Sequence, residues 1–264
     1  MSLPLPNPFT GSMLDKAAFD AGFDEAVGVE GAWRTYRSSQ CTMTLWLTCI
    51  GESLYYAAFS FENVHGGLAE LGTAYLSPLP EGAKGARGTT TLAALRAMLR
   101  RAYQLAVSLP DAPLVLFLKE TASLPKTTEV ERLVVQRKGQ EIFRKSLMAY
   151  WNGRCCMSGL DISPLLRASH IVPWSVATDA ERLDVYNGLL LAPHLDALFD
   201  QHLMSIDDAG LVTMAARLPM NARMALGVNS GLQILEPHRL KPEHQVYLAR
   251  HRTRVGELDS AGPR

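Results

Sequence analysis

The sequence predicts an α+β protein with two domains, and three segments carry that prediction. Residues 41–50 and 54–62 are rich in aromatic and β-branched residues and are separated by Gly-Glu-Ser, which is typical of an antiparallel hairpin. Residues 165–202 have the pattern strand, loop, strand and helix. We therefore expect an N-terminal mixed α/β domain of no recognised type at 1–125 and a second domain at 126–264.

Further elements are expected on either side of the domain boundary. Residues 90–108 have apolar positions at helical spacing, with threonines available as an N-cap, and another helix is expected in the first thirty residues. The apolar segment 112–120 predicts a buried strand. The boundary is placed at 121–129, which is rich in Pro, Thr and Ser.

The second domain is expected to begin with a long helix. The helical pattern runs from residue 129 toward Trp151, Gly139 could break it, and Thr128 and Glu131 have the spacing of a capping box. Pro193 stands where a first-turn proline opens the helix after the second strand. Residues 204–214 alternate around a turn and predict a closing hairpin.

Composition limits the class of protein. The 264 residues contain 26 Lys and Arg and 26 Asp and Glu, so the net charge is zero. No apolar run approaches the ~18 residues of a membrane span, and the N-terminus lacks the features of a signal peptide. Four cysteines, two of them adjacent, do not suggest a disulfide framework, so a reducing, cytoplasmic location is expected.

Basic residues gather in two segments of the second domain, and they allow two interpretations. They could be solvated helix faces, or they could contact phosphates. The residues concerned are Arg132, Arg137, Lys138, Arg144, Lys145 and Arg154, followed by Arg239, Lys241, Arg250, Arg252 and Arg254.

Two motifs, "ASHIVPW" at 168–174 and "NGLLLAPHLDALFD" at 187–200, could carry chemistry. Asp196 and Asp200 are four residues apart and share one helix face. Hydrolysis of a phosphodiester needs a base, a cation and a group that orients the base. Taken singly, each feature has a plainer explanation: solvated aspartates, a packing histidine at His170, or a turn at Asn187–Gly188.

Together the motifs resemble the HNH (ββα-metal) endonuclease family, in particular the branch at the C-termini of restriction endonucleases. The similarity includes the flank "RKGQEIFRKSLMAYWNGRCCMSG" and covers residues 136–215, with the ββα-metal core at about 165–202. It implies that His170 is the general base and that Asn187 braces the loop and orients it. We expect His170 to project toward the carboxylate-bearing face of the helix.

The resemblance also implies a divalent metal site. Asp196 matches a helix-borne metal ligand, Asp200 matches a ligand of some members, and His194 is an additional candidate. Ser169 departs from the acidic residue or histidine that many members have there, and it would be a weak ligand. Mg²⁺ or Mn²⁺ is therefore favoured over Zn²⁺. The chain lacks the CxxC pairs of a structural zinc site, so no structural zinc is expected.

The function implied is a metal-dependent DNA endonuclease, a hydrolase of a restriction or phage-defence system. Its expected partner is double-stranded DNA, which could carry modified bases, and its products would have 5′-phosphate and 3′-hydroxyl ends. A homodimer is expected because one site cuts one strand, and no membrane partner is expected. Two alternatives stay open: a catalytically inactive HNH-fold DNA-binding module, or a nuclease acting on RNA or structured DNA.

The N-terminal domain is the candidate for target recognition. Alternate members of an aromatic run must face opposite sides of a regular strand, and one face could form a wall for an extruded base, modified or unmodified, or belong to an ordinary hydrophobic sheet. The residues concerned are Tyr55, Tyr56, Phe59 and Phe61, together with Arg34, Arg37, Arg87, Arg96, Arg100 and Arg101. In the second domain, Pro173 and Trp174 are expected to pack beneath the site, with a base contact by Trp174 as the alternative.

Overall fold

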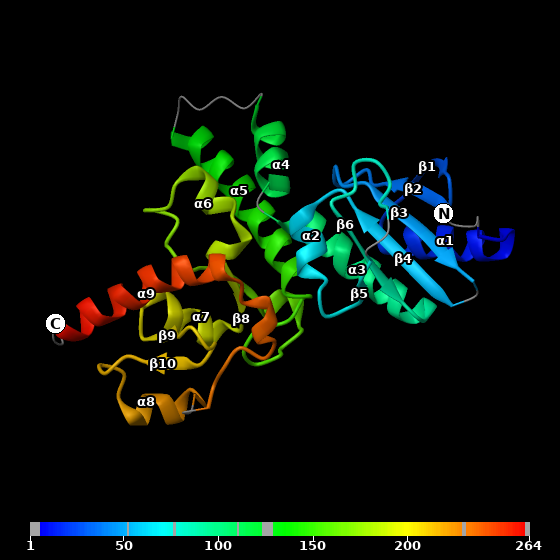
Figure 1. Cartoon of the computed structure of the whole chain (residues 1–264). Coiled ribbons are helices and arrows are strands. Elements are labelled where there is room, and N and C mark those ends of the chain that lie inside the picture. Colours follow the sequence, from blue (N-terminus) through cyan, green and yellow to red (C-terminus); the bar gives the residue numbers. More distant parts are fainter. Residues whose placement is uncertain are drawn as a thin grey trace. The chain divides into compact units, whose positions relative to one another are not determined.

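A computed structural model describes residues 6–51, 53–75, 78–109, 111–122, 129–228 and 231–261, without the side chains of 111 and 129–132. Its contacts divide the chain into two compact units, Met1–Val107 and Ser108–Arg264, which are considered separately. Figure 1 shows the helices and strands of both. Among the described helices, none has both the length and the apolar character needed to cross a bilayer.

The N-terminal unit is built on a six-stranded antiparallel sheet in the order β1-β2-β3-β4-β6-β5. The predicted hairpin is confirmed, because Leu45 lies opposite Phe59 and Ile50 lies opposite Leu54. The strands are β1 Glu25–Glu30, β2 Trp33–Arg37, β3 Leu45–Ile50, β4 Leu54–Phe59, β5 Thr73–Ala74 and β6 Gly85–Thr89.

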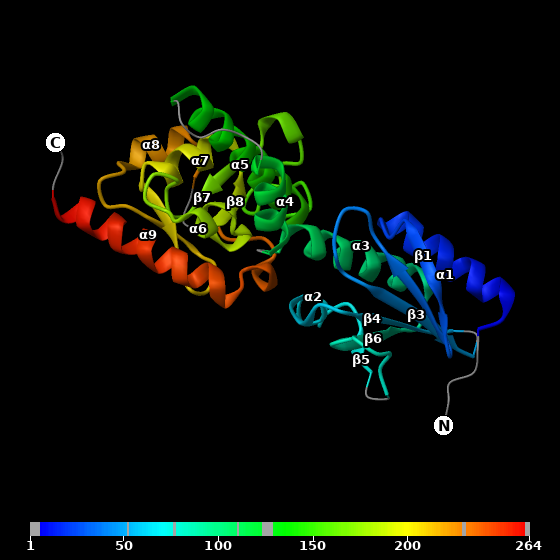
Figure 2. The ribbon, with the colours of Figure 1, turned by 90° about the horizontal axis from the view of Figure 1, so that it is seen from above.

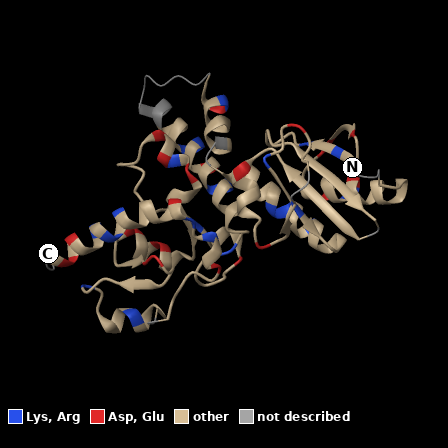
Figure 3. Ribbon diagram, in the orientation of Figure 1, with Lys and Arg blue, Asp and Glu red and all other residues tan. Residues whose placement is uncertain are grey.

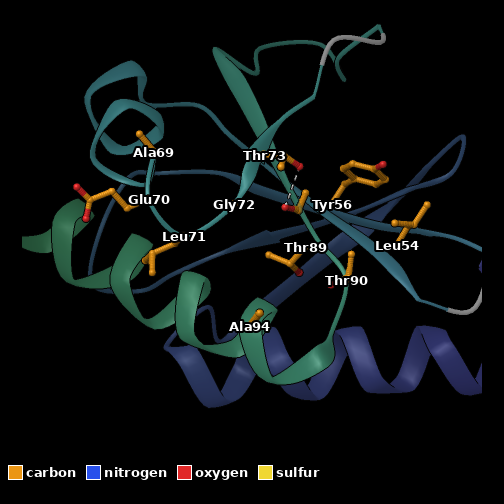
Figure 4. A pocket seen from close by; sticks show the side chains of 11 residues that line it. Leu54, Tyr56, Ala69, Glu70, Leu71, Gly72, Thr73, Thr89, Thr90 and Ala94 are labelled. Carbon is orange, nitrogen blue, oxygen red and sulfur yellow. Dashed lines mark hydrogen bonds between the residues drawn. The ribbon is translucent and has the colours of Figure 1, made fainter.

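Two predicted helices cover one face of this sheet. They are α1 Pro8–Ala21 and α3 Leu92–Ser108, and a short helix, α2 Glu62–Gly67, follows β4. Thr91 caps α3 as expected, since its hydroxyl accepts from the amide of Ala94. Figures 2 and 4 show α1 and α3 side by side, and the rings of Phe23 and Tyr103 meet edge-on between them at 5.8 Å.

The other face of the sheet carries a small aromatic cluster. Trp33, Trp46 and Ala58 are buried there, and Tyr56 and Tyr75 pack against them. Because strand residues alternate between faces, the buried Tyr55 and Phe59 lie on the helix-covered face. Phe61 lies beyond the end of β4, so Tyr56 is the member of the aromatic run that belongs to the aromatic cluster.

The apolar segment 112–120 is not the buried strand that its composition suggested. It forms α4 Asp111–Thr121, which packs against α5 Glu129–Tyr150, and Val115 and Leu118 are 59% and 56% exposed. A short apolar run does not by itself distinguish a strand from a helix. The contacts place α4 in the C-terminal unit, ahead of the expected boundary. Thr128 and the rest of 123–128 lie outside the described residues.

The C-terminal unit surrounds a two-stranded antiparallel hairpin. Helix α5 is continuous through Gly139 and contacts both strands, and the predicted closing hairpin forms as β9 and β10. The other elements are η1 Ser163–Leu165, β7 Arg167–His170, α6 Asp179–Leu183, η2 Val185–Asn187, β8 Gly188–Leu191, α7 Pro193–Asp200, β9 Met204–Ile206, β10 Val212–Met214, α8 Met220–Ala225, η3 Pro237–Arg239 and α9 Pro242–Ser260.

Two buried histidines attach α9 to this core. The ring of His251 stacks on Phe199 of α7 at 3.9 Å, and its Nε2 donates to the Phe199 carbonyl. The Nδ1 of the same ring accepts from the Ser205 hydroxyl of β9 at 2.9 Å. His244 lies among three aromatic rings, and its Nδ1 accepts from the amide of Lys241.

The free energy of unfolding is expected to decrease as the pH falls from about 6.5 to about 4.5. Burial lowers the pKa of His244 to about 3 and that of His251 to about 4. The unfolded chain therefore binds these protons at a higher pH than the folded chain, and stability is complete above the unfolded pKa. Each imidazole contributes a slope of about 1.4 kcal/mol per pH unit.

Urea denaturation at pH 7, 6 and 5 measures this slope. The substitution His238→Ala, at a histidine whose side chain is 47% exposed, serves as the control and should leave it unchanged. Equal free energies of unfolding at pH 7 and pH 5 would contradict the assignment.

Candidate active site

The two faces of the β7–β8 hairpin carry different chemistry. Neighbouring residues of a strand point to opposite faces. The Ser169 hydroxyl hydrogen-bonds to Asp196 of α7, whereas the ring of His170 stacks on Phe143 of α5 at 3.7 Å and 13°. Gly188 lies opposite His170 in the ladder, on the α5 face.

Gly188 is an extended strand residue with φ −152°, so Asn187–Gly188 is not the turn that the dipeptide suggests. Its small size has a packing reason. A Cβ atom at this position would lie 2.5 Å from Phe143 and 2.9 Å from Leu147. Glycine therefore allows α5 to approach the hairpin closely enough for Phe143 to support the histidine.

His170 is held as a neutral imidazole with a defined tautomer. Its Nε2 lies 2.9 Å from the main-chain carbonyl of Arg182. A carbonyl oxygen can only accept, so Nε2 carries the proton and Nδ1 keeps a free lone pair. Burial, together with the positive charge of Arg182, lowers the pKa of His170 to about 4. Within the described part of the chain, the hydrogen bond of this ring is the one made by Nε2, and Nδ1 has no partner.

Asn187 braces the loop that holds this histidine. Its side chain is fully buried; Oδ1 accepts from the amide of Val172, and Nδ2 donates to the carbonyls of Val172 and Glu181. Glu181 immediately precedes Arg182, whose carbonyl accepts from His170. The amide side chain is therefore linked to the imidazole through one peptide unit.

The other face of the hairpin carries carboxylates. Burial raises the pKa of Asp196, the negative charge of Asp200 raises it further, and the Ser169 hydrogen bond and the charge of Arg167 oppose the rise. Asp196 is half-buried and Asp200 is exposed. His194 is exposed and only two residues from Asp196, so it lies about 200° around the helix from it. The structure does not bring His194 to this cluster.

The expectation that His170 projects toward the carboxylate-bearing face of α7 is not met. The ring lies on the α5 face, and Ser169 takes the α7 face in its place. The cause is the two-residue period of the strand, which separates consecutive side chains. Two clusters result, one around His170 and Asn187 and one around Ser169, Asp196 and Asp200.

The carboxylate cluster can be tested as a metal site by its donor atoms. The described residues contain no group of three His, Cys, Asp or Glu side chains placed to hold a metal ion. Two carboxylates four residues apart and a serine hydroxyl nevertheless supply oxygen donors only. That donor set fits an oxygen-preferring divalent ion that keeps several water ligands. Such an ion would offset the burial of the Asp196 carboxylate and its repulsion by Asp200, which both raise the pKa of Asp196.

Phe143 and Arg182, which both contact His170, were missed from the sequence. Phe143 and Leu147 are one helical turn apart, and their role depends on the glycine opposite them, which is a long-range pairing. Arg182 acts through its main-chain carbonyl, so its side-chain identity carries no signal for that contact. Their apolar and basic characters were visible in the sequence, but their position beside the histidine was not.

Comparison with known proteins agrees with this arrangement of strands and helix. Residues 155–207 match the HNH endonuclease family. The matched segment runs from Cys155 to Asp207 and includes the β7–β8 hairpin, Asn187 and α7. The resemblance to this family and the α+β class are thus confirmed. No curated protein matches the chain.

Many of the basic side chains of the C-terminal unit are already paired. Figure 3 shows basic and acidic residues interspersed along its helices. Arg250 binds Glu181 at 2.6 Å, and Arg252 binds Asp208 at 2.9 Å. The guanidinium of Arg144 donates to two main-chain carbonyls. These contacts favour structural and surface roles for these side chains over phosphate contact.

The N-terminal unit contains a cavity of about 490 Å³ at the β5 end of its sheet (Figure 4). Tyr56 and Leu54 line it from β4, and Thr73 and Thr89 contribute hydroxyl groups. Two of the arginines considered for recognition are occupied elsewhere. Arg34 binds Asp15, and Arg87 donates to the carbonyls of His65 and Gly72.

Proposed function

We propose that the chain is a metal-dependent DNA endonuclease that hydrolyses phosphodiester bonds, with His170 as the general base. The membership of residues 155–207 in the HNH endonuclease family supports nuclease activity. The observation that carries the residue assignment is the tautomer of His170, since the hydrogen bond of Nε2 to Arg182 leaves Nδ1 unprotonated.

The proposed chemistry begins at Nδ1. This nitrogen accepts a proton from the attacking water, and the resulting imidazolium is stabilised by the Arg182 carbonyl that Nε2 already faces. Asn187 keeps that carbonyl in place through its bonds to the loop. A divalent ion at Ser169, Asp196 and Asp200, when bound, would neutralise charge on the phosphate and the departing 3′ oxygen.

The separation of the two clusters constrains where the phosphate lies. Ser169 and His170 are consecutive, so their Cα atoms are ~3.8 Å apart although their side chains diverge. β7 ends at His170. A phosphodiester at this end of the strand could meet the imidazole from one face and the carboxylates from the other.

The wider biological role follows from the same proposal. We infer a restriction or phage-defence enzyme in the cytoplasm, in which the N-terminal unit selects the DNA. The cavity beside Tyr56 and the aromatic cluster behind it support a recognition role for this unit. A homodimer would supply the second site needed to cut both strands.

Removal of the metal or of its principal ligand is expected to stop cleavage. The purified chain should nick or cut supercoiled plasmid with Mg²⁺ or Mn²⁺, and EDTA should abolish this. Asp196→Asn should lower the rate by about 100-fold and raise the metal concentration needed, because one anionic ligand is lost. Asp161→Asn, at an exposed aspartate in the same unit, is the control.

If Asp196→Asn retains the wild-type rate and metal dependence, the carboxylate cluster is not the metal site. His170 would still be testable as the base, because its face of the hairpin is separate.

A catalytically inactive DNA-binding domain is the second candidate. The divergence of His170 from the carboxylates and the serine at position 169 favour it. It predicts salt-dependent DNA binding without cleavage under any metal. A panel of unmodified, methylated and hydroxymethylated DNA, structured DNA and RNA separates this candidate from the endonuclease and from a nuclease of RNA or structured DNA.

A further inference from the structure

The C-terminal unit has a cavity of about 810 Å³ beside the His170 cluster. It lies among α4, α5, α6 and the loop after β7. The described residues that line it include Phe117, Gln136, Trp174, Ser175, Asp179 and Arg182. A volume of this size is within the range of small-molecule and cofactor sites and exceeds that of a single nucleobase.

Two walls of the cavity also touch the histidine. The indole of Trp174 meets the His170 ring edge-on at 5.5 Å, and the Arg182 carbonyl accepts from His170. Arg182 in turn donates from Nε to the carbonyl of Trp174, and its guanidinium lies 5.2 Å from the indole centroid. Whatever occupies the cavity is therefore one side chain away from the proposed base.

Helix α5 has a glycine, Gly139, where two aromatic rings of the cavity pack against it. A Cβ atom at Gly139 would lie 2.8 Å from the Trp174 indole and 3.4 Å from the Phe117 ring. The absence of a side chain at 139 lets both rings lie against α5. The rings of Trp174 and Phe117 both line the recess.

Two polar side chains of the lining, the half-exposed Gln136 and the exposed Ser175, are free to hydrogen-bond to a ligand. Within the described residues, the side chains of Gln136 and Ser175 have no hydrogen-bond partner, while Asp179 is held by Arg182 at its exposed rim. A carboxamide offers both donors and an acceptor. Aromatic walls with an unpaired carboxamide suit a planar, hydrogen-bonding heterocycle rather than a simple apolar group.

We propose that this cavity receives a nucleobase of the DNA next to the scissile phosphodiester. The proposal rests on the proposed function, because that function places DNA at His170. A base in the recess stacks against Trp174 or Phe117 and bonds to Gln136, and its phosphate then lies toward the end of β7. Occupancy thus strengthens DNA binding equally before and during the reaction and takes no part in the chemistry.

The proposal is tested with a substitution that fills the cavity and leaves the residues that contact His170 unchanged. Ser175→Trp introduces an indole from the exposed wall, and Val176→Trp, at a 66% exposed neighbour outside the lining, is the matched control. With a cleavable duplex, Ser175→Trp should raise KM about tenfold with little change in kcat, as expected for lost base stacking. A substrate with an abasic residue beside the mapped cut should raise the KM of wild type by a similar factor. Ser175→Trp acting on that abasic substrate should show no further rise in KM.

A binding measurement separates this inference from catalysis. Oligonucleotides with 2-aminopurine scanned through each position are bound in EDTA, where a base stacked in the recess loses fluorescence. Wild type and His170→Ala should quench one position, Val176→Trp should do the same, and Ser175→Trp should not. Quenching without cleavage under any metal would refute the nuclease and keep the base site. If the chain cleaves DNA, and Ser175→Trp has the same KM and the same quenching as wild type, the base site is refuted and the nuclease assignment is kept.

Discussion

Replacing His170 by alanine is expected to lower the rate of DNA cleavage by about 10³-fold, within the range for loss of a general base. The reason is that no other described side chain offers a nitrogen at this end of β7 with a lone pair freed by its hydrogen bonding. Single-turnover cleavage of plasmid at saturating Mg²⁺ measures the loss directly.

The structure suggests suitable controls for this variant. His238→Ala removes an exposed imidazole from the same unit and should cut as well as wild type. Circular dichroism and DNA binding should be retained by His170→Ala, since Phe143 and Trp174 still close the α5 face. A His170→Ala protein that cuts at the wild-type rate would remove this residue as the base.

Replacing Asn187 by alanine is expected to reduce both stability and activity. The substitution leaves the Val172 amide and the Val172 and Glu181 carbonyls without their buried partner. Unsatisfied buried groups cost about 1–3 kcal/mol each, so the free energy of unfolding should fall by about 3 kcal/mol. The cleavage rate should fall as well, even in the fraction that stays folded. Asn187 holds the Glu181 carbonyl, and the carbonyl of the next residue, Arg182, orients His170.

Urea denaturation and cleavage rates measured on the same preparation test both effects. Asn187→Asp should also be impaired, since a carboxylate cannot donate to either carbonyl. Asn221→Ala, at an exposed position in α8, is the control. If Asn187→Ala unfolds at the wild-type urea concentration, the loop is held by other contacts.

Much of the order of elements was predictable from local patterns. Strand-forming residues around a short turn predicted β3 and β4, and helical spacing predicted α3. Pro193 marked the first turn of α7. The apolar segment at 112–120 was wrongly predicted to be a strand. A short apolar run fits both the strand period and the helix period, and only the pattern of buried residues distinguishes them. That pattern depends on the packing of α4 against α5 and cannot be read from the segment itself.

The candidate site was only partly predictable for a related reason. Asn187 and His170 were identified by their spacing within a family pattern, and Asp196 and Asp200 by their shared helix face. His194 was included because it is near in sequence, and helical rotation carries it away. Phe143, Arg182 and the recess beside Trp174 depend on contacts between distant segments.

By itself the sequence determined which residues share a strand, a turn or a helix face, because those relations follow from periods of 2 and about 3.6 residues. Only the tertiary structure decided that α5 covers the His170 face of the hairpin and α7 covers the Ser169 face. The physical reason is that the period of a strand separates its two faces without specifying which helix packs on each. That choice depends on shape, here on the space that Gly188 leaves for Phe143.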